Sequence, residues 1–268
     1  MSADLPGPDL DRVPPRPDRL PVGPTHEDVT RLQSRPRATW TPWEAIAVYV
    51  VAFILGGITT IPILGWIENE DLAVLSASAV ASIVIAGTLL GWLSARHPDW
   101  RDILGFPARR EWWAEIRSSI GFGLALYPAM VFVVGVILAL LLGVISGEPV
   151  EAPEQVPSEP STATVIVTVV YGIVIAPLSE ELFFRGVLFR AVRDRYGLLS
   201  GLLASGVGFG LIHFLDADWQ DALLLIGVMF FNGIALAWWY ERRGTILAPI
   251  VAHVVFNVIG LTLIYTLR

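Results

Sequence analysis

Long apolar runs separated by short polar stretches fill the chain after residue 40. Seven of these runs are long enough, or nearly so, to cross a membrane as helices, namely 45–64, 72–94, 120–145, 163–184, 198–215, 222–240 and 245–265. A helix needs about 20 apolar residues to cross the hydrocarbon core. The fifth run is the shortest, and the fourth includes two adjacent glutamates near its end. The pattern predicts an all-α fold, a polytopic membrane helical bundle of about seven transmembrane helices.

The first 40 residues depart from this pattern. They hold eight prolines among scattered aspartates and arginines, and their apolar residues follow no sustained period. Such a segment buries too little apolar surface to order itself. We therefore expect a disordered, Pro- and Arg-rich cytoplasmic tail over 1–40 and an integral membrane domain over 41–268. Because no apolar run begins before residue 41, the first crossing is expected to direct insertion.

The composition supports the membrane assignment and removes several kinds of chemistry. The 268 residues are 54% hydrophobic and 16% charged, with a mean hydropathy of +0.62. An average soluble domain is about 25% charged. The chain has no cysteine, which excludes disulfides, thiolate metal ligands and a cysteine nucleophile.

Connections that carry basic residues, all of them arginines, alternate along the chain with connections that carry none. Six arginines lie in the tail, five in 95–117, four in 185–195 and two in 241–244, whereas none lies in 69–71, 146–162 or 216–221. Arginine-rich short loops stay on the cytoplasmic side of a membrane. The alternation predicts an amino terminus in the cytoplasm and a carboxyl terminus outside. A lysine-free, arginine-rich composition suggests a bacterial source, and hence the bacterial plasma membrane.

Ionisable groups interrupt three of the apolar runs. The fourth run and the residue after it carry Glu180, Glu181 and Arg185, the fifth carries His213, and the seventh carries His253. Each such group costs at least about 2.5 kcal/mol within a membrane and so marks a functional site by default. A histidine near a helix end can also be an interfacial residue bound to water, and this alternative stays open for His213.

Helical geometry gives the two glutamates different tasks. Successive helical residues are turned by about 100°, so Glu180 and Glu181 cannot both face one small site. Arg185 is four residues after Glu181 and shares its face, which predicts an ion pair. Glu180 is then left free for chemistry. Pro177 lacks a backbone donor and predicts a kink close to these residues.

The two histidines have partners at the same spacing. His253 and Asn257 share one helix face, and Phe209 and His213 share another. The helical rise places Glu180 and His253 at similar depths, each about 15 Å from the arginine-bearing end, but His213 about 24 Å from Gly197. His213 is therefore predicted to lie too far outward unless its helix tilts, starts deeper or re-enters.

Small residues recur at spacings of about four in the fifth run, which allows helices to approach closely in lipid. They are Gly201, Ser205, Gly206, Gly208 and Gly210. We expect this helix to pack inside the bundle.

Three motifs follow one another in the second half of the chain: Glu-Glu-x-x-x-Arg at 180–185, Phe-x-x-x-His at 209–213 and His-x-x-x-Asn at 253–257. In this order they resemble the signatures of the CPBP family of intramembrane endopeptidases, which contains the type II CAAX prenyl proteases, bacteriocin-processing proteins and abortive-infection proteins. The resemblance covers about 163–262, the expected catalytic core. It implies an all-helical membrane fold that hydrolyses peptide bonds near the membrane.

The resemblance also implies roles for individual residues. Glu180 corresponds to the general base that activates water, which His213 helps to position. His253 and Asn257 correspond to groups that stabilise the oxyanion, while Glu181, Arg185 and Phe209 support the site.

Metal dependence is a separate question, because the family is often described as metalloproteases. Glu180, His213 and His253 could ligate zinc, but the expected base would then be a ligand, and no His-Glu-x-x-His motif is present. Metal-free water activation is favoured, with zinc kept as the alternative.

Two other functions remain compatible with these residues. A non-proteolytic immunity or scaffold protein of the same fold is one, and a proton-coupled transporter is the other. The transporter is less favoured because we see no two related halves or paired broken helices. Expected partners are the lipid bilayer and a membrane-associated peptide or protein substrate, with no nucleic acid; substrate identity and oligomeric state are left open.

Overall fold

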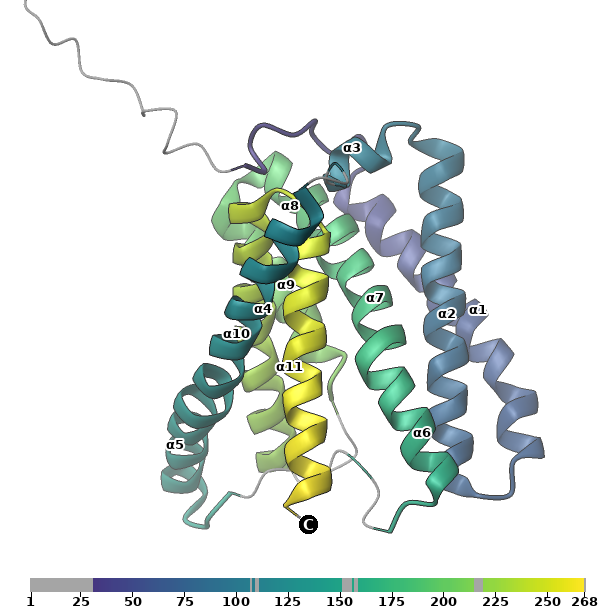
Figure 1. Ribbon diagram of the computed structural model, residues 1–268, viewed down its shortest axis with the longest axis vertical. Helices are drawn as coiled ribbons and strands as arrows, with labels where there is room; N and C mark the ends of the chain where they lie inside the picture. The colour runs from purple at the N-terminus through teal and green to yellow at the C-terminus, as the bar shows by residue number, and fades with distance from the viewer. Residues whose placement is uncertain are drawn as a thin grey trace, which may run out of the picture.

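The computed structural model describes residues 31–106, 108, 111–150, 156, 159–214 and 219–267, and these form helices without any strand. The helices are α1 (Pro42–Trp66), α2 (Glu70–Arg96), α3 (Trp100–Leu104), α4 (Trp112–Pro128), η2 (Ala129–Gly135), α5 (Val136–Ser146), α6 (Thr162–Val170), η3 (Tyr171–Ile175), α7 (Ala176–Glu181), η4 (Leu182–Phe189), α8 (Arg190–Tyr196), α9 (Leu198–Leu211), α10 (Trp219–Arg243) and α11 (Leu247–Thr266). Segments η2, η3 and η4 have π-helical geometry. Figure 1 shows that the long helices run along a common direction as one bundle.

Six helical stretches of the described residues are long and apolar enough to cross a membrane. Two of them, Trp112–Ser146 and Thr162–Tyr196, are 35-residue helices that continue through π-helical turns. A further apolar helix, Leu198–Leu211, is shorter. The prediction of an all-α polytopic bundle with about seven crossings is confirmed.

The boundaries of two predicted crossings differ from the observed helices. The fifth run forms a helix only as far as Leu211, where the chain enters a turn. The third crossing begins at Trp112, within the arginine-bearing stretch 95–117. Of the arginine-free connection 146–162, residues 151–155 and 157–158 lie outside the described residues.

The connections segregate to the two ends of the bundle. In Figure 1 the ordered start of the chain lies at the same end as α3, α8 and the α10–α11 connection, while the carboxyl end lies at the other. The arginine-bearing segments predicted from the loop counts therefore share one end. Which end faces the cytoplasm stays a prediction.

Residues 31–40 precede residue 41, the predicted start of the folded domain, but belong to the described part of the chain. Leu32 and Trp40 are fully buried, and the Trp40 indole donates a hydrogen bond of 2.9 Å to the Val187 carbonyl. The Arg190 guanidinium donates to the carbonyls of Pro36 and Ile103. Residues 31–40 are thus packed against the bundle because apolar and backbone groups there find partners, and the predicted tail applies at most to 1–30, outside the described residues.

Glycines bring α9 against α10. A Cβ atom on Gly206 would lie 2.9 Å from the Phe230 carbonyl oxygen, and one on Gly210 would lie 2.8 Å from that of Ile226. Both separations are too short for a real Cβ atom, so the two backbones can approach only because these positions lack side chains. The predicted packing role of small residues is confirmed for this helix.

Candidate active site

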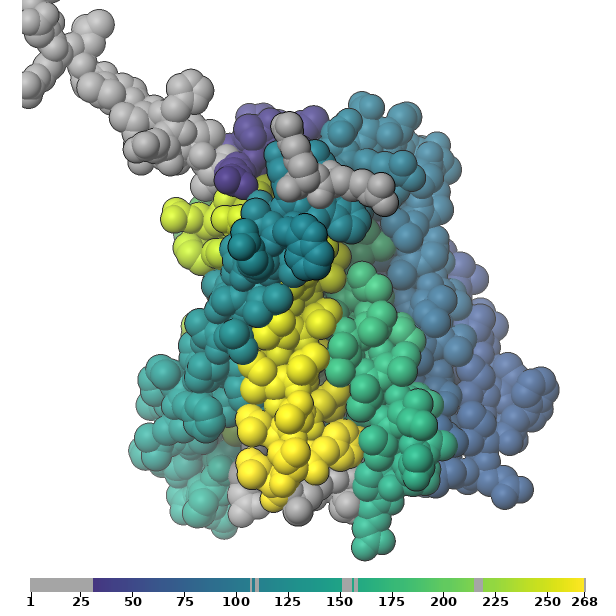
Figure 2. All heavy atoms as spheres, in the orientation of Figure 1, coloured from purple at the N-terminus to yellow at the C-terminus, as the bar shows by residue number. Residues whose placement is uncertain are grey.

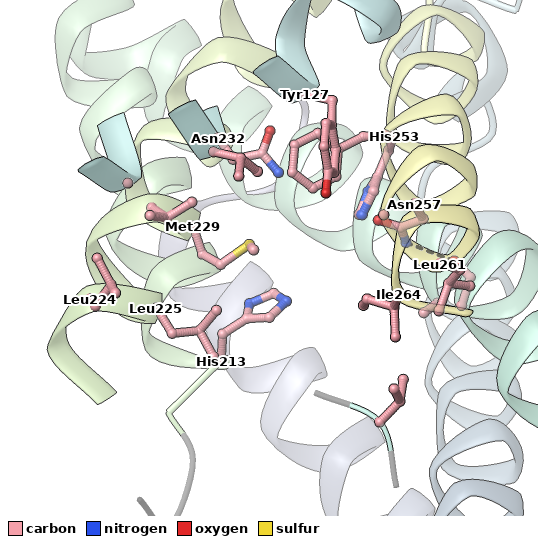
Figure 3. Close-up of a pocket in the computed structure, with 18 of the residues that line it drawn as sticks. Tyr127, His213, Leu224, Leu225, Met229, Asn232, His253, Asn257, Leu261 and Ile264 are labelled. Atoms are coloured by element: carbon pink, nitrogen blue, oxygen red, sulfur yellow. Dashed lines mark hydrogen bonds between the residues drawn. The ribbon is translucent and has the colours of Figure 1, made fainter. Parts of the chain in front are cut away.

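A cavity of about 750 Å³ lies between the helices, within the size range of ligand-binding pockets. All four residues predicted to be catalytic line it: Glu180, His213, His253 and Asn257. Figure 3 shows the His213 ring approaching from one side, with His253 and Asn257 on the opposite side. The cavity follows α11 from His253 to Ile264, toward the end of the bundle where the carboxyl end of the chain lies.

His213 lines the cavity together with the other three residues, although the helical rise placed it further outward than Glu180 and His253. The estimate continued the helix in a straight line past residue 211. In the structure the helix ends at Leu211, and the His213 backbone N–H bonds the Gly210 carbonyl at 3.1 Å in a turn. The turn lets the ring reach the cavity.

The first motif lies in a helix with irregular geometry. The short α7, which contains Pro177, Glu180 and Glu181, is flanked by the π-helical segments η3 and η4. Single π-helical turns occur frequently at functional sites. Regular α-helical geometry is lost directly before Pro177, close to the place where the missing backbone donor predicted a kink.

Glu181 and Arg185 form the ion pair that their spacing predicted. The Arg185 Nη1 to Glu181 Oε1 distance is 2.8 Å, and neither side chain is exposed. Arg185 also donates to the Gly233 carbonyl at 3.2 Å and lies over the Phe209 ring at 4.4 Å. A buried charge requires a partner of this kind. The pair therefore anchors α7 and η4 to α9 and α10.

Glu181 has a second role that the sequence did not reveal. Its Oε1 atom also lies 2.8 Å from His253 Nδ1. A carboxylate can only accept, so the proton of this bond lies on Nδ1. The other ring nitrogen, Nε2, lies 3.8 Å from Glu180 Oε2. Glu181 thus orients the His253 ring toward Glu180, as a carboxylate orients histidines at many active sites.

Glu180 is the less constrained carboxylate. Its side chain is 18% exposed, compared with zero for Glu181. No described residue donates a hydrogen bond to it, and its ion-pair partner is His253, whose Nε2 atom lies 3.8 Å from Glu180 Oε2. Both carboxylate oxygens can therefore accept a proton from a molecule in the cavity.

Phe209 joins the three motifs at one point. It is fully buried, and its ring meets Phe184 at a centroid distance of 5.4 Å, His253 at 5.6 Å and His213 at 4.7 Å. The first two contacts have edge-to-face geometry, which aromatic rings prefer. The ring of Phe209 contacts both histidines and lies between them. This contact is the physical basis of the supporting role predicted for Phe209.

The remaining polar groups of the motifs bond the backbone. His213 Nδ1 lies 2.7 Å from the Phe209 carbonyl, so that nitrogen carries the proton and Nε2 is free to accept. Asn257 Nδ2 donates to the Gly172 carbonyl at 2.7 Å, in the π-helical segment before α7. Asn257 therefore holds the helix of Glu180 in place, in addition to lining the cavity.

The residues considered as zinc ligands do not form a metal-binding cluster. Among the described residues, no group of three or more histidine, aspartate or glutamate side chains has suitable geometry. Nδ1 of His253 is bonded to Glu181 and Nδ1 of His213 to the Phe209 carbonyl, so Nε2 is the nitrogen that each ring leaves available. We derive no step through a metal from this arrangement.

Two residues of the cavity wall were absent from the sequence prediction. Asn232, from α10, is fully buried and lines the cavity, as does Tyr127 from α4. Figure 3 shows both side chains near His253. The signal in the sequence was weak, since Asn232 is a single amide within the apolar run 222–240 and belongs to none of the three motifs.

Comparisons with known proteins agree with this geometry. Residues 162–259 match a family model described as type II CAAX prenyl endopeptidase, Rce1-like. The "Putative membrane peptidase YdiL" of Bacillus subtilis (strain 168) is 30% identical over 89 residues, which is 33% of this chain and 34% of that protein. An "Uncharacterized 24.3 kDa protein" of Escherichia coli is 29% identical over 106 residues, 39% of this chain and 47% of that protein.

The matched segments thus span about a third and about half of these two relatives. No solved structure matches the chain significantly. All three motifs lie within the segment that the family model covers. The resemblance inferred from the motifs is confirmed over residues 162–259, the segment that matches the model of the Rce1-like type II CAAX prenyl endopeptidases.

Proposed function

We propose that this protein is an intramembrane endopeptidase that hydrolyses peptide bonds of membrane-associated substrates with water activated by Glu180. The observation that carries the proposal is the meeting of Glu180, His213 and His253, from three separate helical segments, at one cavity in a membrane-spanning bundle. The names of the family and of the Bacillus subtilis relative support a membrane peptidase.

The chemistry assigns one task to each group. Glu180 accepts a proton from water while the water oxygen attacks the carbonyl carbon of the substrate, and His213 Nε2 accepts a hydrogen bond that positions this water. The tetrahedral intermediate then breaks its carbon–nitrogen bond. Glu180 returns the proton to the leaving amine, so the products are a carboxylic acid and an amine.

His253 acts beside Glu180. Because Nδ1 is held by Glu181, Nε2 is aimed at Glu180 and at the reacting centre. The imidazolium form donates from Nε2 to the oxyanion, and the spare amide hydrogen of Asn257 can do the same. Donors placed in advance for a developing negative charge are a large source of rate enhancement.

We also propose that the protein lies in the bacterial plasma membrane with the arginine-bearing end of the bundle in the cytoplasm. The cavity then extends toward the outer side, because Ile264 lies near the opposite end of α11. Substrates would be membrane-associated proteins or peptides, and no nucleic acid takes part.

A cleavage assay in liposomes tests the base. The substrates are internally quenched peptides of varied sequence, each tethered to one membrane-spanning helix. Glu180→Gln should lower kcat by about 100-fold or more, since general bases contribute about 10²–10⁴. Glu70→Gln, an exposed glutamate at the start of α2, is the matched control and should cleave normally.

Four outcomes would contradict the proposal or part of it. Undiminished cleavage by Glu180→Gln would reject the base assignment. A wild-type protein that cleaves no member of the set would favour the non-proteolytic relative, and proton uptake coupled to a solute would favour a transporter. Dialysis against a chelator should leave the rate unchanged; a loss restored by Zn²⁺ would instead make Glu180 and the histidines metal ligands.

A further inference from the structure

Asn232 carries a buried amide whose hydrogen-bonding groups are both unused. It lies in α10 with no exposed surface, and neither Oδ1 nor Nδ2 has a partner among the described residues. Burying a polar group without a partner costs about 1–3 kcal/mol. An apolar residue would avoid this cost in an otherwise apolar stretch of helix, and a molecule bound in the cavity would supply the partner that the protein does not.

The position of Asn232 indicates where that partner binds. The residue lines the same cavity as Glu180, His253 and Asn257. Figure 3 shows its side chain extending from α10 toward Tyr127 and His253. The next residue, Gly233, accepts a hydrogen bond from Arg185 through its carbonyl, and a Cβ atom there would lie 2.9 Å from Gly206 Cα. The backbone that carries Asn232 is thus fixed against both α9 and the first motif.

Of the donors expected at the oxyanion, Asn257 Nδ2 already gives one of its two hydrogens to the Gly172 carbonyl, and His253 Nε2 lies 3.8 Å from Glu180 Oε2. Asn232 Nδ2 retains both of its hydrogens. A donor shielded from water at the wall of a cavity interacts more strongly with a developing charge than one in water.

We infer that Asn232 is a further catalytic residue, whose amide nitrogen donates a hydrogen bond to the carbonyl oxygen of the substrate peptide bond and to the oxyanion formed from it. The inference rests on the proposed peptidase function. Oδ1 of the same amide can accept from a substrate N–H, so one side chain matches both polar groups of a peptide backbone.

The test uses the full-length protein in liposomes with the same tethered, quenched peptides. Asn232→Leu keeps the branched shape and removes both polar atoms. We expect kcat to fall by about 100-fold, as for the loss of one oxyanion donor, with KM changed much less. The unfolding midpoint should stay equal or rise, because an unsatisfied buried group is removed.

Ser205→Ala is the matched control. The Ser205 hydroxyl is also fully buried and without a partner among the described residues, but Ser205 does not line the cavity. Its removal should leave kcat unchanged. Asn232→Ala provides a second truncation in case leucine disturbs the packing.

The outcomes separate this inference from the function on which it rests. Normal kcat in Asn232→Leu or in a folded Asn232→Ala, with an active wild type, would overturn the role of Asn232 and leave the peptidase intact. An equal loss of kcat in Ser205→Ala would also overturn it, since a general effect of buried polar groups would then explain the result. A wild type without activity would overturn both.

Discussion

Removal of Arg185 tests how strongly the bundle depends on the buried ion pair of the first motif. Arg185→Met keeps a long side chain in the same space but leaves the carboxylate of Glu181 without its cation. That carboxylate has no exposed surface. The same substitution removes the donor to the Gly233 carbonyl and the cation over the Phe209 ring.

The expected loss follows from the geometry. Charges 2.8 Å apart attract by about 6 kcal/mol at an effective dielectric constant of about 20. His253 Nδ1 bonds the same Glu181 oxygen and keeps part of this stabilisation. Breaking a buried pair by removing one partner costs about 3–5 kcal/mol. We therefore expect Arg185→Met to lower the free energy of unfolding by about 3 kcal/mol, the lower end of that range.

The assay is reversible unfolding in mixed detergent micelles, followed by circular dichroism and tryptophan fluorescence. The set comprises wild type, Arg185→Met, Glu181→Gln and the double variant. The double variant should lose less stability than Arg185→Met alone, because no buried charge is left unpaired. Arg195→Met, an exposed arginine on the following α8, is the control and should change the free energy of unfolding by at most about 0.5 kcal/mol.

Either of two results would refute the reasoning. If Arg185→Met is as stable as wild type, the pair does not hold the helices together. If the double variant is as unstable as Arg185→Met, the loss comes from packing around the guanidinium rather than from an unpaired carboxylate.

Two further predictions concern the contact between α9 and α10 and the behaviour of the bundle end with pH. Gly206→Ala should lower the unfolding midpoint, because its Cβ atom would lie 2.9 Å from the Phe230 carbonyl oxygen. Gly57→Ala is the control and should not lower the midpoint, since no atom lies within 4 Å of a Cβ atom there. Equal midpoints for the two variants would contradict the close approach of α9 and α10. Burial lowers the pKa of His97, and this effect outweighs the rise in pKa caused by the charge of Glu44. The unfolded chain then binds a proton at His97 more readily than the folded chain does. The contribution of His97 to the free energy of unfolding is therefore complete above the unfolded pKa of about 6.5. It is lost as pH falls through that value toward the folded pKa. His97→Asn should therefore show a smaller fall in unfolding midpoint between pH 8 and pH 5.5 than wild type, and an identical fall would exclude this contribution.

The sequence by itself determined the features that depend on local order along the chain. Hydropathy identified the crossings, and helical spacing paired Glu181 with Arg185, because neighbours at i and i+4 share a helix face whatever surrounds them. The order of the three motifs indicated the resemblance that the family model matches over residues 162–259. The same local reasoning continued the helix of His213 past Leu211, since the apolar pattern does not mark the turn at which this helix ends.

Only the tertiary structure decided how side chains from different helices meet. The bond between Glu181 and His253, the position of Phe209 between the motifs and the unpaired amide of Asn232 all depend on how the helices are rotated and spaced relative to one another. Glycines set that spacing where α9 meets α10, because a Cβ atom at these positions would lie too close to atoms of the facing helix. Rotation and spacing of this kind arise from packing between segments far apart in the chain, so no local pattern encodes them.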